Sequence, residues 1–234
     1  MNKDIDTLVY WFDGYKPTPP DMEVFFKECQ GKGYKCIRDK EFVKSCFKDS
    51  YHPNEHHCKL EYHYDKVLKQ YASFLKIPFT ESDFFKQKYT DKGFDLKYLI
   101  PKNSHKYSID VFSSKNGNIK KHYDGDFSQI VNFDKHCDFM VYDTGYHRLF
   151  VGSHSFFHMK NQTINDDAPK VLIVGDSQTV PIIPILCNYC KELVYVDVRC
   201  INSRLQNIVK SINFNKRIIQ LYNDKPIKWW KKYV

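Results

Sequence analysis

The feature that most restricts the fold is a short apolar run, Val-Leu-Ile-Val at residues 171–174, followed by Gly175, Asp176 and Ser177. Consecutive β-favouring residues between a lysine and a glycine are typical of a strand buried on both faces, as in a parallel sheet. The apolar residues 179–190 are suited to pack on that sheet as a helix. The pattern predicts Ser177 between the carboxyl end of a central strand and the amino end of a helix, where open α/β sheets place their chemistry. On the tripeptide alone, a tight turn without chemistry is favoured.

The rest of the chain alternates between the periods of strands and helices. Apolar runs predict strands at 7–12, 34–37, 192–199 and 217–222, and helical spacing predicts helices at 21–29, 60–75 and 203–210. This alternation predicts an α/β fold with a doubly wound, mostly parallel sheet flanked by helices. Short aromatic runs separated by turn signals predict inserted hairpins or loops at 80–165. A length of 234 residues predicts a single domain, 1–234, that contains this insert.

Composition excludes some classes of function and leaves others open. The net charge of +8 is spread among acidic residues, so we expect no nucleic-acid partner. No apolar stretch approaches the length of about 20 residues that spans a bilayer. The eight cysteines are irregularly spaced and no apolar targeting run precedes them, which predicts reduced thiols and a cytoplasmic location for the chain as given. The aromatic content of 16% suits a sugar-binding surface as well as a core.

A polar segment rich in histidine precedes the helix at 60–75 and offers a base for Ser177. Glu55 and His57 are two residues apart, so their side chains fall on the same side of an extended chain. Glu55 is then able to accept one ring N–H of His57 while the other ring nitrogen faces Ser177. The backbone N–H of Ser177, at a helix start, supplies part of an oxyanion hole. These residues predict a serine nucleophile activated by a histidine and a carboxylate.

Other interpretations of the polar residues remain open. The histidine segment is equally typical of a solvated loop. A metal site has potential ligands in His52, His56, His57, Cys58, His63, Cys187 and Cys190. Their spacing is not that of a zinc finger, and buried packing is the better interpretation of the last two cysteines, so we expect no metal and no other cofactor. A looser group, Asp143, His147 and His154, is a reserve acid and base.

The order of these motifs resembles the DHHW-type, alginate O-acetyltransferase-like branch of the SGNH hydrolase superfamily. The resemblance rests on Glu-His-His-Cys at 55–58 before a helix, Gly-Asp-Ser at 175–177, and the following strand that ends at Arg199. It implies an SGNH three-layer sandwich in which Glu55 is the acid, His57 the general base and Ser177 the nucleophile. It also implies that Arg199 lies near the active site or the acetylated sugar.

The resemblance further implies an enzyme that moves or removes an acyl group, most often acetyl, on a carbohydrate hydroxyl. The implied partners are a glycan acceptor and an acyl donor. Ser177, Gly152 in a polar turn of the insert, and Arg199 form the predicted group for oxyanion and substrate binding.

The sequence departs from the family at two positions, with Glu55 in place of an aspartate and Cys58 in place of a tryptophan. Family members usually work in the periplasm or outside the cell, so the resemblance favours such a location if an export signal has been removed. The alternative function is a catalytically silent glycan-binding module with the same fold.

Overall fold

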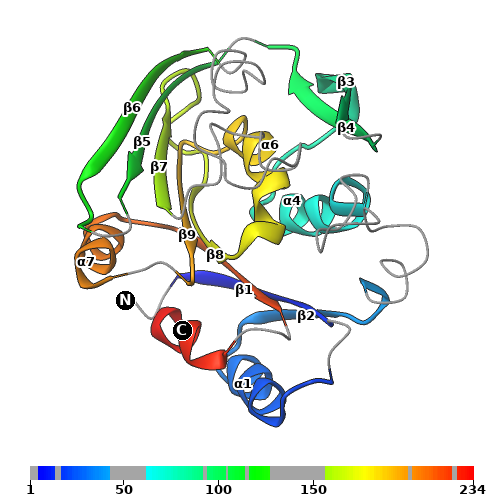
Figure 1. Cartoon of the computed structure of the whole chain (residues 1–234), viewed down its shortest axis with the longest axis vertical. Coiled ribbons are helices and arrows are strands. Elements are labelled where there is room, and N and C mark those ends of the chain that lie inside the picture. The colour runs from blue at the N-terminus through cyan, green and yellow to red at the C-terminus, as the bar shows by residue number, and fades with distance from the viewer. Residues whose placement is uncertain are drawn as a thin grey trace.

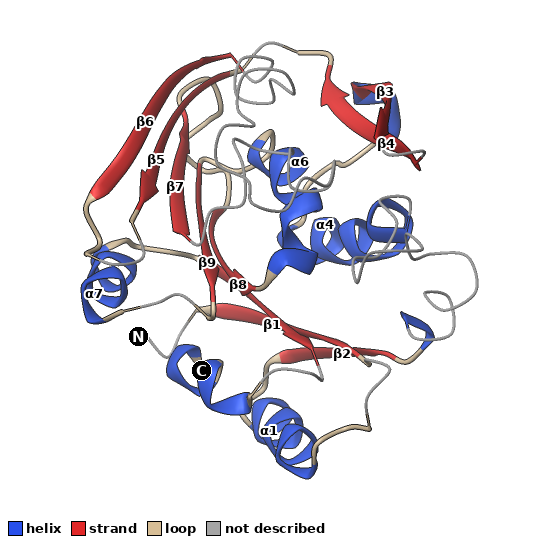
Figure 2. Cartoon of the chain, in the orientation of Figure 1, coloured by secondary structure: helices blue, strands red, loops and turns tan. Residues whose placement is uncertain are grey.

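The computed structural model describes residues 5–13, 17–42, 62–91, 94–103, 105–113, 116–126, 156–199, 202–222 and 226–234. Its main feature is an eight-stranded sheet with the strand order β2-β1-β10-β8-β9-β7-β5-β6 (Figure 1). Helices lie on both sides of this sheet (Figure 2).

One half of the sheet is parallel, and the strand that precedes Ser177 lies inside it. Its strands are β2 (Lys35–Asp39), β1 (Asp6–Phe12), β10 (Lys216–Tyr222), β8 (Lys170–Gly175) and β9 (Glu192–Asp197). β8 pairs with β10 on one side and with β9 on the other. Its residues 171–175 are all buried, because helices cover both faces of the sheet here. The buried central strand predicted from the apolar run is confirmed.

The other half of the sheet is antiparallel and differs from the expectation. It consists of β7 (Phe156–Asn161), β5 (Lys106–Phe112) and β6 (Ile119–Asp126), with β7 antiparallel to β9. A separate hairpin is formed by β3 (Phe84–Asp91) and β4 (Phe94–Pro101).

The predicted α/β class is confirmed, but the sheet is mixed rather than mostly parallel and doubly wound. The physical reason is that β7 pairs with the free side of β9, and β5 and β6 continue the sheet from β7 in place of further βαβ units. The single domain at 1–234 stays a prediction.

Short helices connect the strands. The α-helices are α1 (Pro20–Gly31), α4 (Lys69–Leu75), α6 (Ile183–Cys187) and α7 (Ser203–Ser211). A π-helical stretch, η2 (His63–Leu68), leads into α4, and single 3₁₀ segments are η3 (Glu81–Asp83), η6 (Ser177–Ile182), η7 (Ile227–Trp229) and η8 (Lys231–Tyr233). Asn202 caps α7, since its side chain accepts a hydrogen bond from the Leu205 N–H at 2.9 Å.

Two apolar cores fix the sheet between these layers. The core on one face joins η2, α4 and α6 to the sheet, and the core on the other joins α1, α7 and the C-terminal 3₁₀ turns. In the second core the Trp230 indole N–H donates to the Gln220 carbonyl at 2.8 Å, which attaches the chain end to β10. Among the helices that the structure describes, none is long and apolar enough to cross a membrane.

Candidate active site at the carboxyl edge of the sheet

Only one residue, Asp176, separates the end of β8 from the beginning of η6. Asp176 is the N-cap, and its Oδ1 accepts a hydrogen bond from the Gln178 N–H at 3.0 Å. The Thr179 N–H donates to the Asp176 carbonyl at 3.0 Å. Ser177 is the first residue of η6, so it follows the carboxyl end of a central strand, as expected. The helix differs in kind: a 3₁₀ segment precedes the short α6, because proline at 181 and at 184 offers no N–H for helical hydrogen bonds.

Gly175 is required by the tightness of this turn. A Cβ atom at residue 175 would lie 2.1 Å from Thr179 Oγ1 and 3.4 Å from the Cβ of Gln220 on β10. Ordinary contact between such atoms is about 3.5–4.0 Å. The absence of a side chain therefore lets the first turn of η6 fold back against the end of β8.

Arg199 lies beside this turn and is held by Asp197 at the end of β9. Its Nε is 2.8 Å from Asp197 Oδ1, its Nη2 is 2.5 Å from Oδ2, and its backbone N–H donates to Oδ1 at 2.9 Å. Asp197 is opposite Gly175 in the sheet register, and the Val198 N–H donates to the Gly175 carbonyl at 2.9 Å. The hydrogen bond to Asp197 is the main cause that raises the pKa of Arg199, and the Asp176 carboxylate adds to it. The guanidinium is thus a fixed cation at the edge where Ser177 stands.

A buried polar layer supports the turn from the side of α4. The Tyr195 hydroxyl donates to the Asp176 carbonyl at 2.9 Å, and the Tyr71 hydroxyl donates to Gln220 Oε1 at 2.8 Å. Burial, and then the charge of Asp176, raise the pKa of Tyr71, so this phenol stays a donor. Thr179 Oγ1 and Gln220 Nε2 have no hydrogen-bond partner among the residues that the structure describes. The bond from Tyr71 therefore provides the polar compensation of the Gln220 side chain.

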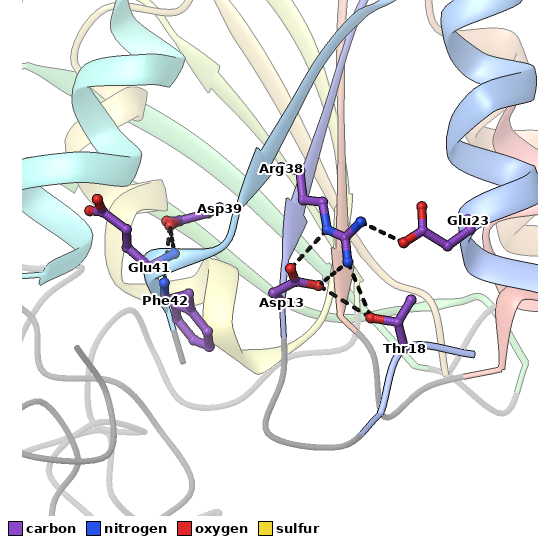
Figure 3. Close-up of polar contacts among 7 residues, drawn as sticks. All are labelled: Asp13, Thr18, Glu23, Arg38, Asp39, Glu41 and Phe42. Carbon is purple, nitrogen blue, oxygen red and sulfur yellow. Dashed lines mark hydrogen bonds and ion pairs between the residues drawn. The ribbon is translucent and has the colours of Figure 1, made fainter. Parts of the chain in front are cut away.

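A second polar group stabilises the ends of β1 and β2 (Figure 3). Arg38 Nε is 2.8 Å from Asp13 Oδ2, its Nη2 is 3.0 Å from Asp13 Oδ1, and its Nη1 is 2.5 Å from Glu23 Oε1 on α1. The guanidinium carbon lies 4.0 Å from the ring centre of Trp11. The hydrogen bond to Asp13 is the main cause that raises the pKa of Arg38. Arg38 thus joins the loop after β1, the strand β2 and the helix α1.

Several predicted site residues fall outside the described part of the chain. Glu55 and His57 belong to residues 43–61, and Gly152 belongs to residues 127–155. The reserve group of Asp143, His147 and His154 lies outside as well. The roles of these residues stay predictions, while Ser177 and Arg199 are brought to one edge of the sheet.

The cysteines and histidines of the described chain do not assemble into a metal centre. No group of three or more His, Cys, Asp or Glu side chains able to hold a metal ion occurs among the described residues. Cys187 and Cys190 are buried free thiols in the apolar core, as predicted, and burial raises the pKa of both. Protonated, buried thiols are poor nucleophiles and poor metal ligands.

Two histidines on the antiparallel half of the sheet contact carboxylates, and their pKa values are shifted in opposite directions. His122 has Nδ1 at 2.7 Å from Asp110 and Nε2 at 2.8 Å from Asp124, and these bonds, Asp110 first, raise its pKa. His158 Nε2 is 2.6 Å from Glu192, but burial outweighs this partner and lowers the pKa of His158.

Tyr71, Gln220 and Asp197 were not identified as site residues from the sequence. The first two lie 149 positions apart, and neither belongs to a recognisable motif. A signal was present for Asp197, since an aspartate after an apolar run, two residues before an arginine, is able to accept the arginine N–H in a turn.

Comparison with solved structures shows which fold this is. The chain shares its fold with PatB1 and with a DHHW family protein. Its structure is similar to that of Bacillus cereus PatB1 with a sulfonyl adduct, with a TM-score of 0.63 and 14% identity over 95% of this chain and 81% of PatB1. It is also similar to a DHHW family protein from Eubacterium siraeum, with a TM-score of 0.62 and 13% identity over 94% of this chain and 78% of that protein.

A scan of the sequence against protein-family models gave no match, and no curated protein matched it. The two solved structures nevertheless confirm, at the level of the fold, the resemblance predicted from the motifs at 55–58 and 175–177.

Proposed function

We propose that the chain is a carbohydrate O-acetyltransferase or acetylesterase that works through an acyl-enzyme on Ser177. The observation that supports the proposal is the place of Ser177, as first residue of η6 after β8, with Arg199 fixed by Asp197 beside it. The fold is shared with PatB1, which has been seen with a sulfonyl adduct. A sulfonyl group is an electrophile of the kind that an activated serine hydroxyl attacks.

In the first step Ser177 Oγ attacks the carbonyl carbon of the acetyl donor. His57 takes the hydroxyl proton, and Glu55 accepts the other ring N–H so that the imidazolium is stabilised. The negative charge develops on the former carbonyl oxygen, where the backbone N–H of Ser177 and that of Gly152 donate hydrogen bonds. The intermediate collapses to acetyl-Ser177 while the leaving group takes the proton from His57.

In the second step a hydroxyl group attacks acetyl-Ser177. His57 removes its proton and returns it to Ser177 Oγ as the bond to the acetyl group breaks. A sugar hydroxyl gives transfer and a water molecule gives hydrolysis, so the two activities differ only in the second nucleophile.

Arg199 binds the sugar or the donor in this proposal. Its Nε and Nη2 are occupied by Asp197, no hydrogen bond to Nη1 occurs within the described part of the chain, and the side chain retains 36% exposure. Nη1 is therefore a donor whose direction is fixed by Asp197. Two carboxylates, Asp176 and Asp197, surround this one guanidinium, which favours a neutral hydroxyl or ester oxygen over an anionic group.

The test is hydrolysis of a chromogenic acetate ester, followed by labelling with a serine-directed phosphonate. We expect Ser177→Ala and His57→Ala to lose the activity while circular dichroism stays unchanged. Ser73→Ala, at an exposed position of α4, is the matched control and should keep it. Mass spectrometry should find the phosphonate on Ser177 and on no other serine.

Activity that survives Ser177→Ala, or a label on a different serine, would overturn the proposed nucleophile. If the unmodified chain neither hydrolyses the ester nor reacts with the phosphonate, but binds glycans, the proposal of an enzyme fails. The chain is then a glycan-binding module.

A further inference from the structure

The inference concerns Tyr195, a buried tyrosine of β9 that the proposed mechanism does not use. Its side chain is only 1% exposed, and in the sheet register it stands between Ile173 of β8 and Phe157 of β7. The ring centroids of Phe157 and Tyr195 lie 5.5 Å apart. A close-packed ring in a core keeps one rotamer, so the direction of the Tyr195 hydroxyl is set by the sheet.

The Tyr195 hydroxyl contacts the turn that presents Ser177. It lies 2.9 Å from the Asp176 carbonyl oxygen, and it is the donor of this hydrogen bond because a carbonyl oxygen only accepts. The Thr179 N–H donates to the same oxygen at 3.0 Å. Two donors therefore converge on the peptide group that joins Asp176 to Ser177.

The same peptide group contains the backbone N–H of Ser177. In a trans peptide the C=O and the N–H lie in one plane and point in opposite directions, and the described part of the chain has no cis peptide bond. Because the Asp176 carbonyl is held toward Tyr195, the Ser177 N–H is directed away from the buried phenol. Ser177 is the first residue of η6, so this N–H has no acceptor within the helix itself.

Backbone hydrogen bonds and the capping carboxylate hold the neighbouring parts of the turn. The Val198 N–H donates to the Gly175 carbonyl at 2.9 Å, and Asp176 Oδ1 accepts the Gln178 N–H at 3.0 Å. Neither bond involves the Asp176 carbonyl. Replacement of Tyr195 by phenylalanine therefore acts on the peptide group between Asp176 and Ser177 and leaves these two bonds in place.

We propose that Tyr195 is a positioning residue, whose hydroxyl orients and polarises this peptide group so that the Ser177 N–H serves as an oxyanion donor. The inference rests on the proposed function, which assigns that N–H to the oxygen where negative charge develops. Donors stabilise such charge most when they are oriented before the reaction begins. A carbonyl that accepts a hydrogen bond also makes the N–H of its own amide a stronger donor, since hydrogen bonds in a chain polarise one another.

Tyr195→Phe and Tyr107→Phe form a matched pair for the test. Each removes one buried phenolic hydroxyl and keeps the ring, but the Tyr107 hydroxyl donates to Asn188 Oδ1 at 2.6 Å, at the end of α6. Loss of a whole oxyanion donor costs about a hundredfold to a thousandfold in kcat. Tyr195→Phe keeps the Ser177 N–H and only loosens it, so we expect kcat for the acetate ester to fall by about tenfold with little change in KM, and Tyr107→Phe to stay within about threefold.

A second measurement reports on the oxyanion position itself. When the phosphonate has reacted completely with Ser177, its phosphoryl oxygen occupies the place of the developing oxyanion. The ³¹P resonance of this adduct should therefore shift in Tyr195→Phe and stay unchanged in Tyr107→Phe. Urea unfolding of both variants measures the loss of stability that a purely structural hydrogen bond would also cause.

The outcomes separate this inference from the proposed function. If the unmodified chain is active and Ser177→Ala is not, but the two tyrosine variants agree in kcat and in ³¹P shift, Tyr195 only stabilises the fold and the proposed function stands. A rise in KM at unchanged kcat would overturn the positioning role as well, because the hydroxyl would then act on binding rather than on developing charge. If the unmodified chain reacts with neither the ester nor the phosphonate, the proposed function fails, and the positioning role fails with it.

Discussion

Gly175→Ala tests whether the turn after β8 requires a residue without a side chain at position 175. The new Cβ would lie 2.1 Å from Thr179 Oγ1 and 3.2 Å from Thr179 Cβ. The first distance is more than 1 Å below ordinary contact, so the first turn of η6 has to move. Overpacking of a buried site costs about 1–3 kcal/mol. With a urea m value of about 2 kcal/mol/M, a cost of about 2 kcal/mol lowers the midpoint of unfolding by about 1 M.

Two further variants show whether Thr179 is the obstacle. Thr179→Ala removes the atom at 2.1 Å, so the double variant with Gly175→Ala should recover at least about 1 kcal/mol beyond the sum of the single changes. Thr179→Val keeps a branched side chain at the same place and should give no recovery. Gly31→Ala is the control, because no heavy atom of the described chain lies within 4 Å of its added Cβ. It should be neutral or stabilise the fold by about 0.4–1 kcal/mol.

The assay is urea unfolding followed by tryptophan fluorescence and circular dichroism, with ester hydrolysis measured on the folded variants. Strictly additive free energies for Gly175→Ala and Thr179→Ala would refute the contact. A midpoint for Gly175→Ala that equals the unmodified one would refute the argument from the turn altogether.

Three other outcomes follow from the described contacts. Tyr71→Phe should lower the free energy of unfolding by about 1–2 kcal/mol, because Gln220 loses its donor in a buried layer; an unchanged urea midpoint would contradict this. Arg38→Lys keeps the charge but loses the paired bonds to Asp13, and thermal unfolding should show a loss of about 1 kcal/mol; a change below about 0.3 kcal/mol would count against the network. For His122 the pKa is raised above 6.5, so its contribution to stability is complete below that pH and is lost as pH rises through the raised value. An NMR titration of the His122 ring with a midpoint at or below 6.5 would be contrary to that sign.

The parallel half of the fold could be predicted because its signals are local. β8 is a run of apolar residues that ends at a glycine, and α7 begins after a capping asparagine. Each of these patterns reports what one segment does in water and in a core. β1, β8 and β10 extend one residue beyond a predicted end, β2 begins one residue later and ends two residues later than predicted, and β9 ends two residues earlier. The order of these strands along the chain is as predicted.

The antiparallel half could not be predicted in the same way. β5 and β7 fall within the predicted hairpins or loops at 80–165, but no strand was predicted at the position of β7, and nothing in its sequence specifies β9 as its neighbour. Pairing of that kind is decided by packing between segments far apart in the chain. The alternation of side chains with a period of two residues is the same in an isolated hairpin and in a strand added to the edge of a sheet.

The candidate site divides along the same line between local and distant contacts. β2, β8 and β9 lead directly into Asp39, Asp176 and Asp197, and each of these aspartates accepts a backbone N–H from two residues further on. This turn is local and is written in the sequence as an acidic residue after an apolar run. The second oxygen of Asp197 also has a local partner, since it accepts a hydrogen bond from Arg199. The second oxygen of Asp39 accepts hydrogen bonds from Tyr62 and Tyr10, which are 23 and 29 positions away.

The aspartates at the strand ends therefore do two things at once. A carboxylate oxygen that accepts the N–H of its own turn stops the strand at the edge of the sheet, and the remaining acceptor capacity is left pointing along that edge. For Asp39 and Asp197 this capacity is used to hold a second group in place, a tyrosine in one case and an arginine in the other. Polar groups are thus found at the carboxyl edge because the strands end there. Donors that are held in place at this edge are able to stabilise charge that develops near Ser177. Replacing Asp197 should therefore alter the chemistry at Ser177 more than replacing Asp166, an exposed aspartate whose partner Lys191 directly precedes the amino end of β9, at the opposite edge of the sheet.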